Sequence, residues 1–459
     1  MKMNNIFKGI SFAMVALAAL TTTSCKDEPD AYKIADGTPV VNYIRPVDAS
    51  AKDSLLTSAA LRSTICIVGQ NLRSVTALYF NDQKAVLNTS YMTDNTLIVT
   101  VPNEIPEKIS DKIFLCTNSK DTVEYAFRVE IPSPVVSSMS NEWAAAGEEV
   151  TINGDYFLDY ENAPLTVKFG ENYELDRSYI TKITKTGVTF TMPADAPQGE
   201  KISVASTYGT TEASFQYMDK RNMLFDFDTP NPVTNEILGN NGWHARTIIT
   251  DGTSLSGNFM ILGETSMDAK GAWNDGNFSF EYWAGDWQNP EPFSKHPRLF
   301  DVADFTDFEN MSLKFEMNIP EDNAWSAAPM QIFFGGTDKV SNGAAGSKDV
   351  YGNVLAGCNN VYFHEQGKLP RALYMPWKDQ DDKLYHTSGK WMTVTIPFSE
   401  FIYDYDGNKL SNGYSSSTDF ANLVIFVVKG SYNDKTVLPD GVDCNPIIKI
   451  DNIRVVPNK

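Results

Sequence analysis

The sequence predicts an all-β chain made of two small β-sandwiches in tandem and one larger sandwich after them. Its apolar segments are short, about four to seven residues, and turn residues separate them at regular intervals. One pattern of strands and turns occurs twice in succession between residues 39 and 219. From residue 220 onward the apolar segments are longer and alternate in polarity, and no stretch has a convincing helical period.

The N-terminal residues 1–24 have the pattern of a secretory signal peptide. Two lysines supply positive charge, and the apolar run over residues 10–20 is too short to cross a bilayer as a helix. The letters TTTS follow and lead directly to Cys25. A cysteine in this place resembles a lipobox, so we expect Cys25 to be lipidated and residues 25–38 to form a lipidated linker. An ordinary signal peptide with an incidental cysteine is the alternative.

The segment KDEPD directly after Cys25 is short and mostly acidic. It resembles the export tag of lipoproteins that glycan-degrading gut bacteria display on the outer face of the outer membrane. A solvated acidic spacer is the alternative. No later stretch reaches the about 20 apolar residues that a membrane helix needs. We therefore expect an outer-membrane protein that faces the cell exterior and is held by its lipid anchor.

The formal net charge of −20 at pH 7 narrows the class of partner. The chain has no basic stripe that could neutralise phosphates, so we expect no nucleic-acid partner. Acidic polysaccharides would be repelled by the same charge. A neutral partner is therefore favoured.

Four cysteines remain besides the predicted lipidation site, namely Cys66, Cys116, Cys358 and Cys444. Their wide spacing excludes a zinc ribbon. Disulfides are permitted in a secreted protein. Buried free thiols suit strand positions equally well, so both states remain open.

The two small sandwiches are predicted from a repeat of roughly 85 to 95 residues, over residues 39–131 and residues 132–219. The segments ICIVGQNL, LYFND and IVTVP of the first repeat match VTINGDYF, VKFG and VTFTMP of the second. The glycine of the first segment can adopt backbone conformations that are closed to other residues. The proline of the third segment ends a strand because it removes a donor from the ladder.

This repeated pattern, I-x-G-x-x-(L/F) followed by V-x-F and V-x-(V/M)-P, resembles the immunoglobulin-like IPT/TIG domain. The resemblance implies two immunoglobulin-like sandwiches that hold the following domain away from the membrane. IPT/TIG domains of some intracellular proteins bind DNA, but the secretion signal and the negative charge argue against that role here. Pro132 and Pro134 would stiffen the junction between the two repeats.

The last region, residues 220–459, is predicted to form a two-sheet β-jelly roll. Its strand signals alternate clearly, with Met392, Val394 and Ile396 on one face and threonines on the other. Three segments carry a resemblance to carbohydrate-binding modules of the jelly-roll type, namely LFDFD, GKWMTVTIPFSEF and IKIDNIRVVP.

A lipobox, two IPT/TIG-like domains and a jelly-roll module, in this order, resemble the surface glycan-binding proteins of the B type from bacterial polysaccharide-utilisation systems. The resemblance covers nearly the whole mature chain. It implies a non-catalytic cell-surface lipoprotein that binds a neutral polysaccharide, a plant β-glucan such as xyloglucan or mixed-linkage glucan, for capture before degradation and import. It also implies a neighbouring glycan importer as a partner.

Aromatic side chains in polar surroundings are the candidate binding residues. A sugar ring has an apolar C–H face and a fringe of hydroxyls, so its binding sites combine aromatic platforms with polar side chains. We expect the platforms and their neighbouring donor to be Trp283, Trp287, Trp325, Tyr362, Arg371, Tyr374 and Trp377. Packing in the core is the alternative for each of them. Trp391 opens a core strand and is expected to pack, whereas Trp243 and Trp273 suit either role.

No metal site or cofactor is expected. Asp226, Asp228 and Asp451 stand at strand ends where related modules keep a structural calcium ion. Residues 404–408 look like the start of a calcium loop, but the glutamate at the twelfth position is missing. Turn and sheet-edge roles are therefore favoured for these carboxylates, and a structural calcium ion is the alternative.

The sequence also predicts that the protein is not an enzyme. Residues 252–257 lack the second glycine of a nucleophile elbow, and His364-Glu365 lacks the second histidine of a zinc-protease helix. A glycosidase needs only two carboxylates at the right separation, which sequence spacing cannot exclude. A surface hydrolase or lyase on a jelly roll is therefore the main alternative, and a protein-binding adhesin is the other.

Overall fold

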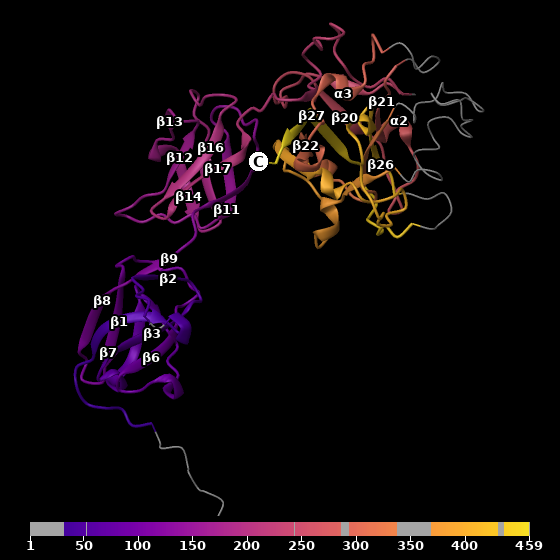
Figure 1. The fold of residues 1–459 in the computed structure, drawn as a ribbon. Helices are drawn as coiled ribbons and strands as arrows, with labels where there is room; N and C mark the ends of the chain where they lie inside the picture. The colour runs from indigo at the N-terminus through magenta and orange to yellow at the C-terminus, as the bar shows by residue number, and fades with distance from the viewer. Residues whose placement is uncertain are drawn as a thin grey trace, which may run out of the picture. The chain divides into compact units, whose positions relative to one another are not determined.

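The computed structural model describes residues 32–51, 53–242, 244–285, 293–336, 369–429 and 436–458. The chain divides into two compact units after Pro132 (Figure 1). The described residues form strands joined by turns, with two short α-helices, α2 (Asp275–Phe278) and α3 (Leu299–Val302), which confirms the predicted all-β class. Within these ranges no helix is long and apolar enough to cross a membrane. The predicted signal peptide and Cys25 lie outside them.

The first unit is a β-sandwich. Its strands are β1 (Val40–Pro46), β3 (Thr64–Gln70) and β6 (Thr96–Thr100) in one sheet, β5 (Gln83–Lys84), β4 (Val75–Phe80), β7 (Lys112–Thr117) and β8 (Thr122–Ala126) in another, and the parallel pair β2 (Ser58–Ala60) and β9 (Arg128–Glu130). Alternate residues of β7 are buried, as a strand with one core face requires. Cys66 and Cys116 are free thiols, and burial raises the pKa of Cys66.

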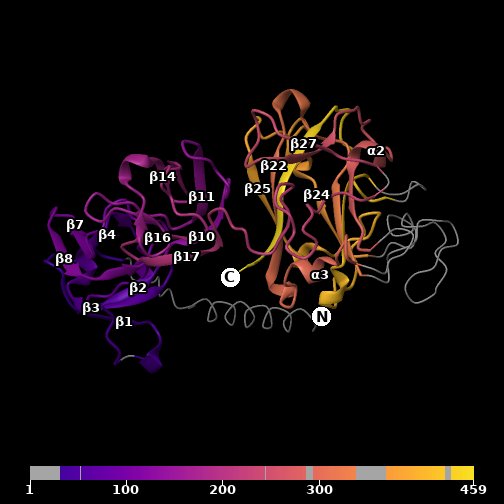
Figure 2. The same cartoon turned by 90° about the horizontal axis from the view of Figure 1, so that it is seen from above.

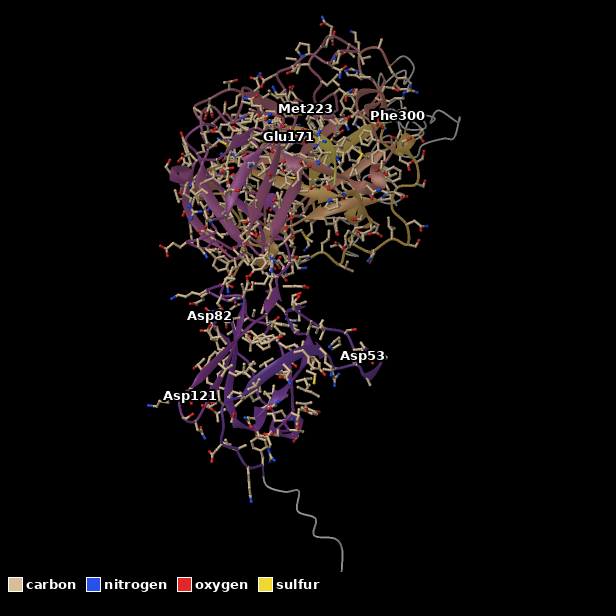
Figure 3. All side chains as sticks on the ribbon, turned by 60° about the vertical axis from the view of Figure 1, so that its left-hand side comes forward. Asp53, Asp82, Asp121, Glu171, Met223 and Phe300 are labelled. Atoms are coloured by element: carbon tan, nitrogen blue, oxygen red, sulfur yellow. The ribbon has the colours of Figure 1, made fainter. Side chains whose placement is uncertain are left out.

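Acidic side chains lie exposed on the first unit. Figure 3 labels three of them, Asp53, Asp82 and Asp121. They account for part of the net charge of −20, and this surface would repel phosphates. The prediction that the chain has no nucleic-acid partner rests on this charge.

The second unit begins with another sandwich, which we call the second sandwich (residues 133–219). One sheet has the order β10 (Val135–Met139), β11 (Glu149–Asp155), β15 (Gly187–Thr191) and β14 (Ile180–Thr184). The other has the order β13 (Tyr173–Glu174), β12 (Thr166–Phe169), β16 (Lys201–Ser206) and β17 (Gly209–Gln216). Apolar side chains from both sheets, Ile152, Phe169 and Phe190 among them, fill the space between them.

The repeat is visible in the backbone as well as in the sequence. Gly69 on β3 lies so close to β1 that an added Cβ would stand 1.8 Å from the carbonyl oxygen of Val40. Gly154 on β11 has the same relation to β10, with 1.8 Å to the carbonyl oxygen of Val135. A register shift of the first strand accompanies both contacts. Close approach of the neighbouring strand is therefore the reason for glycine at both positions.

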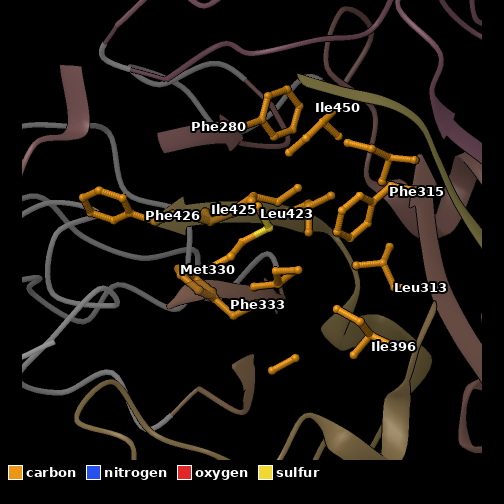
Figure 4. Close-up of a cluster of buried hydrophobic side chains, with 14 of the residues drawn as sticks. Phe280, Leu313, Phe315, Met330, Phe333, Ile396, Leu423, Ile425, Phe426 and Ile450 are labelled. Atoms are coloured by element: carbon orange, nitrogen blue, oxygen red, sulfur yellow. The ribbon is translucent and has the colours of Figure 1, made fainter. Parts of the chain in front are cut away.

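The rest of the second unit is a two-sheet jelly roll (Figure 2). The first sheet has the order β19 (Thr247–Ile249), β20 (Phe259–Gly263), β27 (Ile447–Pro457), β22 (Met311–Asn318) and β25 (Met392–Pro397), and β18 (Met223–Phe225) pairs with β27. The second sheet has the order β21 (Ser279–Tyr282), β26 (Asn422–Val427), β23 (Met330–Gly335) and β24 (Arg371–Tyr374). Their apolar faces meet in one core, where Phe315 of β22 and Ile425 of β26 belong to the same buried cluster (Figure 4).

A buried group of charges joins the second sandwich to the jelly roll, and we call it the junction cluster: Glu142, Lys314, Glu316, Thr393 and Arg454. The Arg454 guanidinium donates to Glu142 at 2.9 Å and to Glu316 at 2.7 Å. Lys314 forms an ion pair with the second oxygen of Glu142. The Thr393 hydroxyl donates to Glu316 at 3.1 Å and accepts the backbone N–H of Glu142 at 2.7 Å. Two carboxylates and two cations thus compensate one another.

Burial shifts the pKa values of Glu316 and Arg454, the two central members of the junction cluster, in opposite directions. It raises the pKa of Glu316 to about 7, although the neighbouring Arg454 acts against that shift. Burial alone would lower the pKa of Arg454, but Glu316 and Glu142 raise it overall. Because an unpaired charge here would be costly, both partners must keep their geometry.

Candidate functional site

Two of the predicted platforms, Trp325 and Trp377, are completely buried. Both indole N–H groups donate to the carbonyl oxygen of Ala328, at 3.0 Å and 3.2 Å. The backbone of Trp325 also pairs with the backbone of Tyr385 in an isolated antiparallel β-bridge. An indole without exposed surface cannot stack on a sugar, so the predicted platform role is wrong for both residues.

Arg371 and Trp283 are buried as well. Arg371 on β24 donates to the Gln331 side chain at 2.9 Å, and its guanidinium lies 4.6 Å from the centre of the Phe333 ring. Burial lowers the pKa of Arg371 to about 10. The Trp283 indole donates to Glu281 at 3.1 Å. Both side chains serve internal packing and hydrogen bonding, so their predicted contact with a glycan is corrected.

Trp287 and Tyr362 lie outside the described residues, as does Trp243. The binding roles predicted for Trp287 and Tyr362 stay predictions, and both roles stay open for Trp243. Trp391 is buried against Phe259 with 5.7 Å between the ring centres, which confirms its predicted packing role. Trp273 is half-buried and meets Phe426 edge-on at 4.7 Å.

Tyr374 remains as the predicted binding residue that is both described and partly exposed. It ends β24 and packs against Trp325, with 6.0 Å between the ring centres. Burial raises the pKa of the Tyr374 hydroxyl, and a hydrogen bond with Tyr385 adds to this effect. The phenol is therefore neutral at every physiological pH and can both donate and accept a hydrogen bond.

Tyr374 lies between two hollows, which we call together the Tyr374 groove. The smaller hollow measures about 400 Å³ and is lined by Met375, Lys378, Glu400 and Tyr403, among others. The larger measures about 950 Å³. Both volumes fall within the range usual for small-molecule sites. Because Tyr374 and Thr395 line both hollows, a ligand of several sugar units could pass from one to the other over the tyrosine ring.

The larger hollow is lined by aromatic and polar residues of the jelly roll and by mostly polar residues of the second sandwich. The jelly roll contributes Tyr385, His386 and Trp391, which follow one another in the segment before β25. The second sandwich contributes Ser138 and Asn153. Aromatic rings suit the C–H face of a sugar, and hydroxyl and amide groups suit its hydroxyls. The groove can therefore hold an uncharged polyhydroxylated chain.

Tyr385, His386 and Tyr403 were not among the residues predicted from the sequence. A usable signal was present in the segment KLYHTSGK, where two ring residues stand among polar ones before a core strand. The same signal applied to Trp325 and Trp377, whose rings turned out to point inward. Local polarity alone therefore did not separate the exposed rings from the buried ones.

The carboxylates considered for calcium are occupied by hydrogen bonds. Asp228 accepts from Asn258, and Asp451 accepts from the backbone N–H of Asn452 at 2.7 Å and from Ser256 at 3.2 Å. Burial raises the pKa of Asp451 to about 8, which favours its neutral form. In the described ranges no group of three histidine, cysteine or carboxylate side chains is arranged to hold a metal ion.

Comparison with known proteins matches both parts of the second unit. A family model described as the surface glycan-binding protein B xyloglucan-binding domain matches residues 217–457, and the IPT/TIG domain model matches residues 134–217. The crystal structure of a surface glycan-binding protein B from Prevotella bryantii has a TM-score of 0.86 and 62% sequence identity, and the match covers 93% of this chain and 100% of that chain.

A curated relative, an IPT/TIG domain-containing protein of Bacteroides ovatus, is 27% identical over 202 residues. This match covers 40% of the chain and 39% of the relative's own length. It therefore supports the sandwich architecture over part of both proteins.

Proposed function

The chain belongs to the surface glycan-binding protein B family, and from this premise we propose that it binds a neutral plant β-glucan in the Tyr374 groove. Xyloglucan is the first candidate because the matching family model is named for it, and mixed-linkage glucan is the second. Members of the family are glycan-binding proteins and not enzymes, so the alternative of a jelly-roll hydrolase or lyase is set aside. The adhesin alternative has no support from these matches.

The position of Tyr374 carries the proposal. Its ring is partly exposed, is fixed from behind by Trp325, and lies where the two hollows meet. A ring held in this way can stack on a sugar with little loss of side-chain freedom on binding. Tyr385 and Tyr403 stand on either side and extend the aromatic surface along the groove.

Replacing Tyr374 with alanine is expected to weaken xyloglucan-oligosaccharide binding about fivefold to thirtyfold, because one stacking ring and its buried area are lost. Isothermal titration calorimetry on the secreted chain without its anchor would measure this. Tyr179→Ala is the matched control, since Tyr179 is a partly exposed tyrosine of the second sandwich that does not line the groove. Circular dichroism would show that both variants are folded. Equal affinity for both variants and the parent chain would contradict the assignment.

We further propose that Cys25 carries a lipid that anchors the protein on the exterior of the outer membrane, with a glycan importer as its neighbour. The short apolar run before Cys25 and the acidic segment after it support the anchor and the outward display. Labelling of cells with a radioactive fatty acid would test the anchor. The label should be found on the parent chain and be lost from Cys25→Ala, and equal labelling of both would contradict the proposal.

A further inference from the structure

We propose that the second sandwich is part of the glycan site, so that a long glycan chain touches both this sandwich and the jelly roll. The inference rests on the proposed function and assigns a second wall to the same groove. The second sandwich was predicted from the sequence to be a spacer. Its residues instead line the larger hollow together with those of the jelly roll.

The wall consists of polar side chains on β10 and β11 and the loop between them. Ser138 on β10, Asn141 in the loop, and Glu149 and Asn153 on β11 line the larger hollow. Asn153 is exposed, and its amide donates to the Ser138 hydroxyl at 3.3 Å. The exposed side chain of Asn153 is among those that line the hollow. An amide that both donates and accepts is suited to a pair of neighbouring sugar hydroxyls.

The two sides of the larger hollow offer a sugar chain both partly exposed aromatic rings and hydrogen-bonding groups. Tyr374 and Tyr385 supply partly exposed rings on the side of the jelly roll, beside polar residues such as Lys390, whereas the opposite wall supplies hydroxyl, amide and carboxylate groups. A β-glucan stacked on the rings would present the hydroxyls along its other edge to that wall. Because the side chains of the wall are mostly uncharged, the wall suits a neutral glycan.

The junction cluster keeps this wall in place. Next to the wall residues, the carbonyl oxygen of Ser140 accepts the backbone N–H of Thr393 at 2.9 Å, and the backbone N–H of Glu142 donates to the Thr393 hydroxyl at 2.7 Å. Thr393 itself lines the larger hollow. The buried ion pairs of Glu142 with Arg454 and Lys314 reinforce the same contact. The second sandwich can therefore act as a fixed half of a site, which lowers the ordering cost of binding.

The dependence of affinity on glycan length provides the test. The secreted chain, Asn153→Ala and Ser138→Trp would be titrated with xyloglucan oligosaccharides of one, two and three repeating units. Loss of the Asn153 amide should weaken binding of the longest oligosaccharide about threefold to tenfold and leave the shortest unchanged. Ser138→Trp places a bulky ring in the hollow and should weaken binding of the longest oligosaccharide at least as much. Asn172→Ala is the matched control, because Asn172 is an exposed asparagine of the same sandwich away from the groove.

The outcomes separate this inference from the proposed function. Suppose that Tyr374→Ala weakens binding while Asn153→Ala and Ser138→Trp bind oligosaccharides of every length as the parent chain does. The assignment of the Tyr374 groove is then supported and the second wall is refuted. If the parent chain binds no β-glucan of any length, the proposed function itself fails. A length-dependent loss in both wall variants, with Asn172→Ala unchanged, supports the second wall.

Discussion

Replacing Arg454 with methionine is expected to lower the free energy of unfolding of the second unit by about 3–5 kcal/mol, because Glu316 would then be buried without its cation and Glu142 would keep Lys314 alone. Urea unfolding followed by tryptophan fluorescence would measure the loss. Lys201→Met is the matched control, since Lys201 and Glu212 form a pair on the surface. Removing that pair should cost at most about 1 kcal/mol. Equal midpoints for the two variants would contradict the role assigned to the junction cluster.

The same variant should respond to pH in a definite direction. The folded-state pKa of Glu316, already raised to about 7 by burial, should rise further once Arg454 is gone. A carboxyl group whose pKa is higher in the folded state binds a proton more tightly there, so lowering the pH toward the unfolded-state pKa stabilises the fold. The deficit of Arg454→Met should therefore be larger at pH 8 than at pH 5. A deficit that grows as the pH falls would contradict this account.

Replacing Trp377 with alanine is expected to destabilise the second unit by about 3–5 kcal/mol, because a fully buried indole leaves a large cavity. The Ala328 carbonyl also loses one of its two indole donors. Differential scanning calorimetry would record the fall in melting temperature, and Trp377→Phe should lose less because the ring is retained.

The binding of this variant separates a core role from a platform role. At a temperature where the variant is still folded, we expect its affinity for a β-glucan oligosaccharide to stay within about threefold of the parent chain, because the indole offers no face to the ligand. An unchanged melting temperature together with lost affinity would restore the platform role that the sequence suggested for Trp377.

The architecture was predictable because it depends on patterns that repeat or alternate. The glycines at positions 69 and 154 marked the same close strand contact in both sandwiches, and the alternation of Met392, Val394 and Ile396 predicted a strand where β25 lies. Such patterns record which face of a strand meets the core. The chain divides into two units after Pro132, and the second sandwich and the jelly roll, predicted as separate domains, lie together in the second unit.

The site was harder to predict because neighbouring residues in the sequence do not decide whether an aromatic side chain points into the core or toward solvent. Trp325 stands among polar residues, yet its indole turns inward to donate to Ala328. Lys314 and Glu316 alternate with apolar residues on β22, a pattern that usually marks a face in water. Here that face is covered by Glu142, which lies more than 170 positions earlier in the chain. Only the folded structure brings these residues together.

A crystal structure of the secreted chain with a xyloglucan oligosaccharide would test the central claim most directly. We expect a sugar ring stacked on Tyr374, with the chain running between Tyr385 and Tyr403. A glycan bound without contact to Tyr374 would contradict the assignment of the Tyr374 groove.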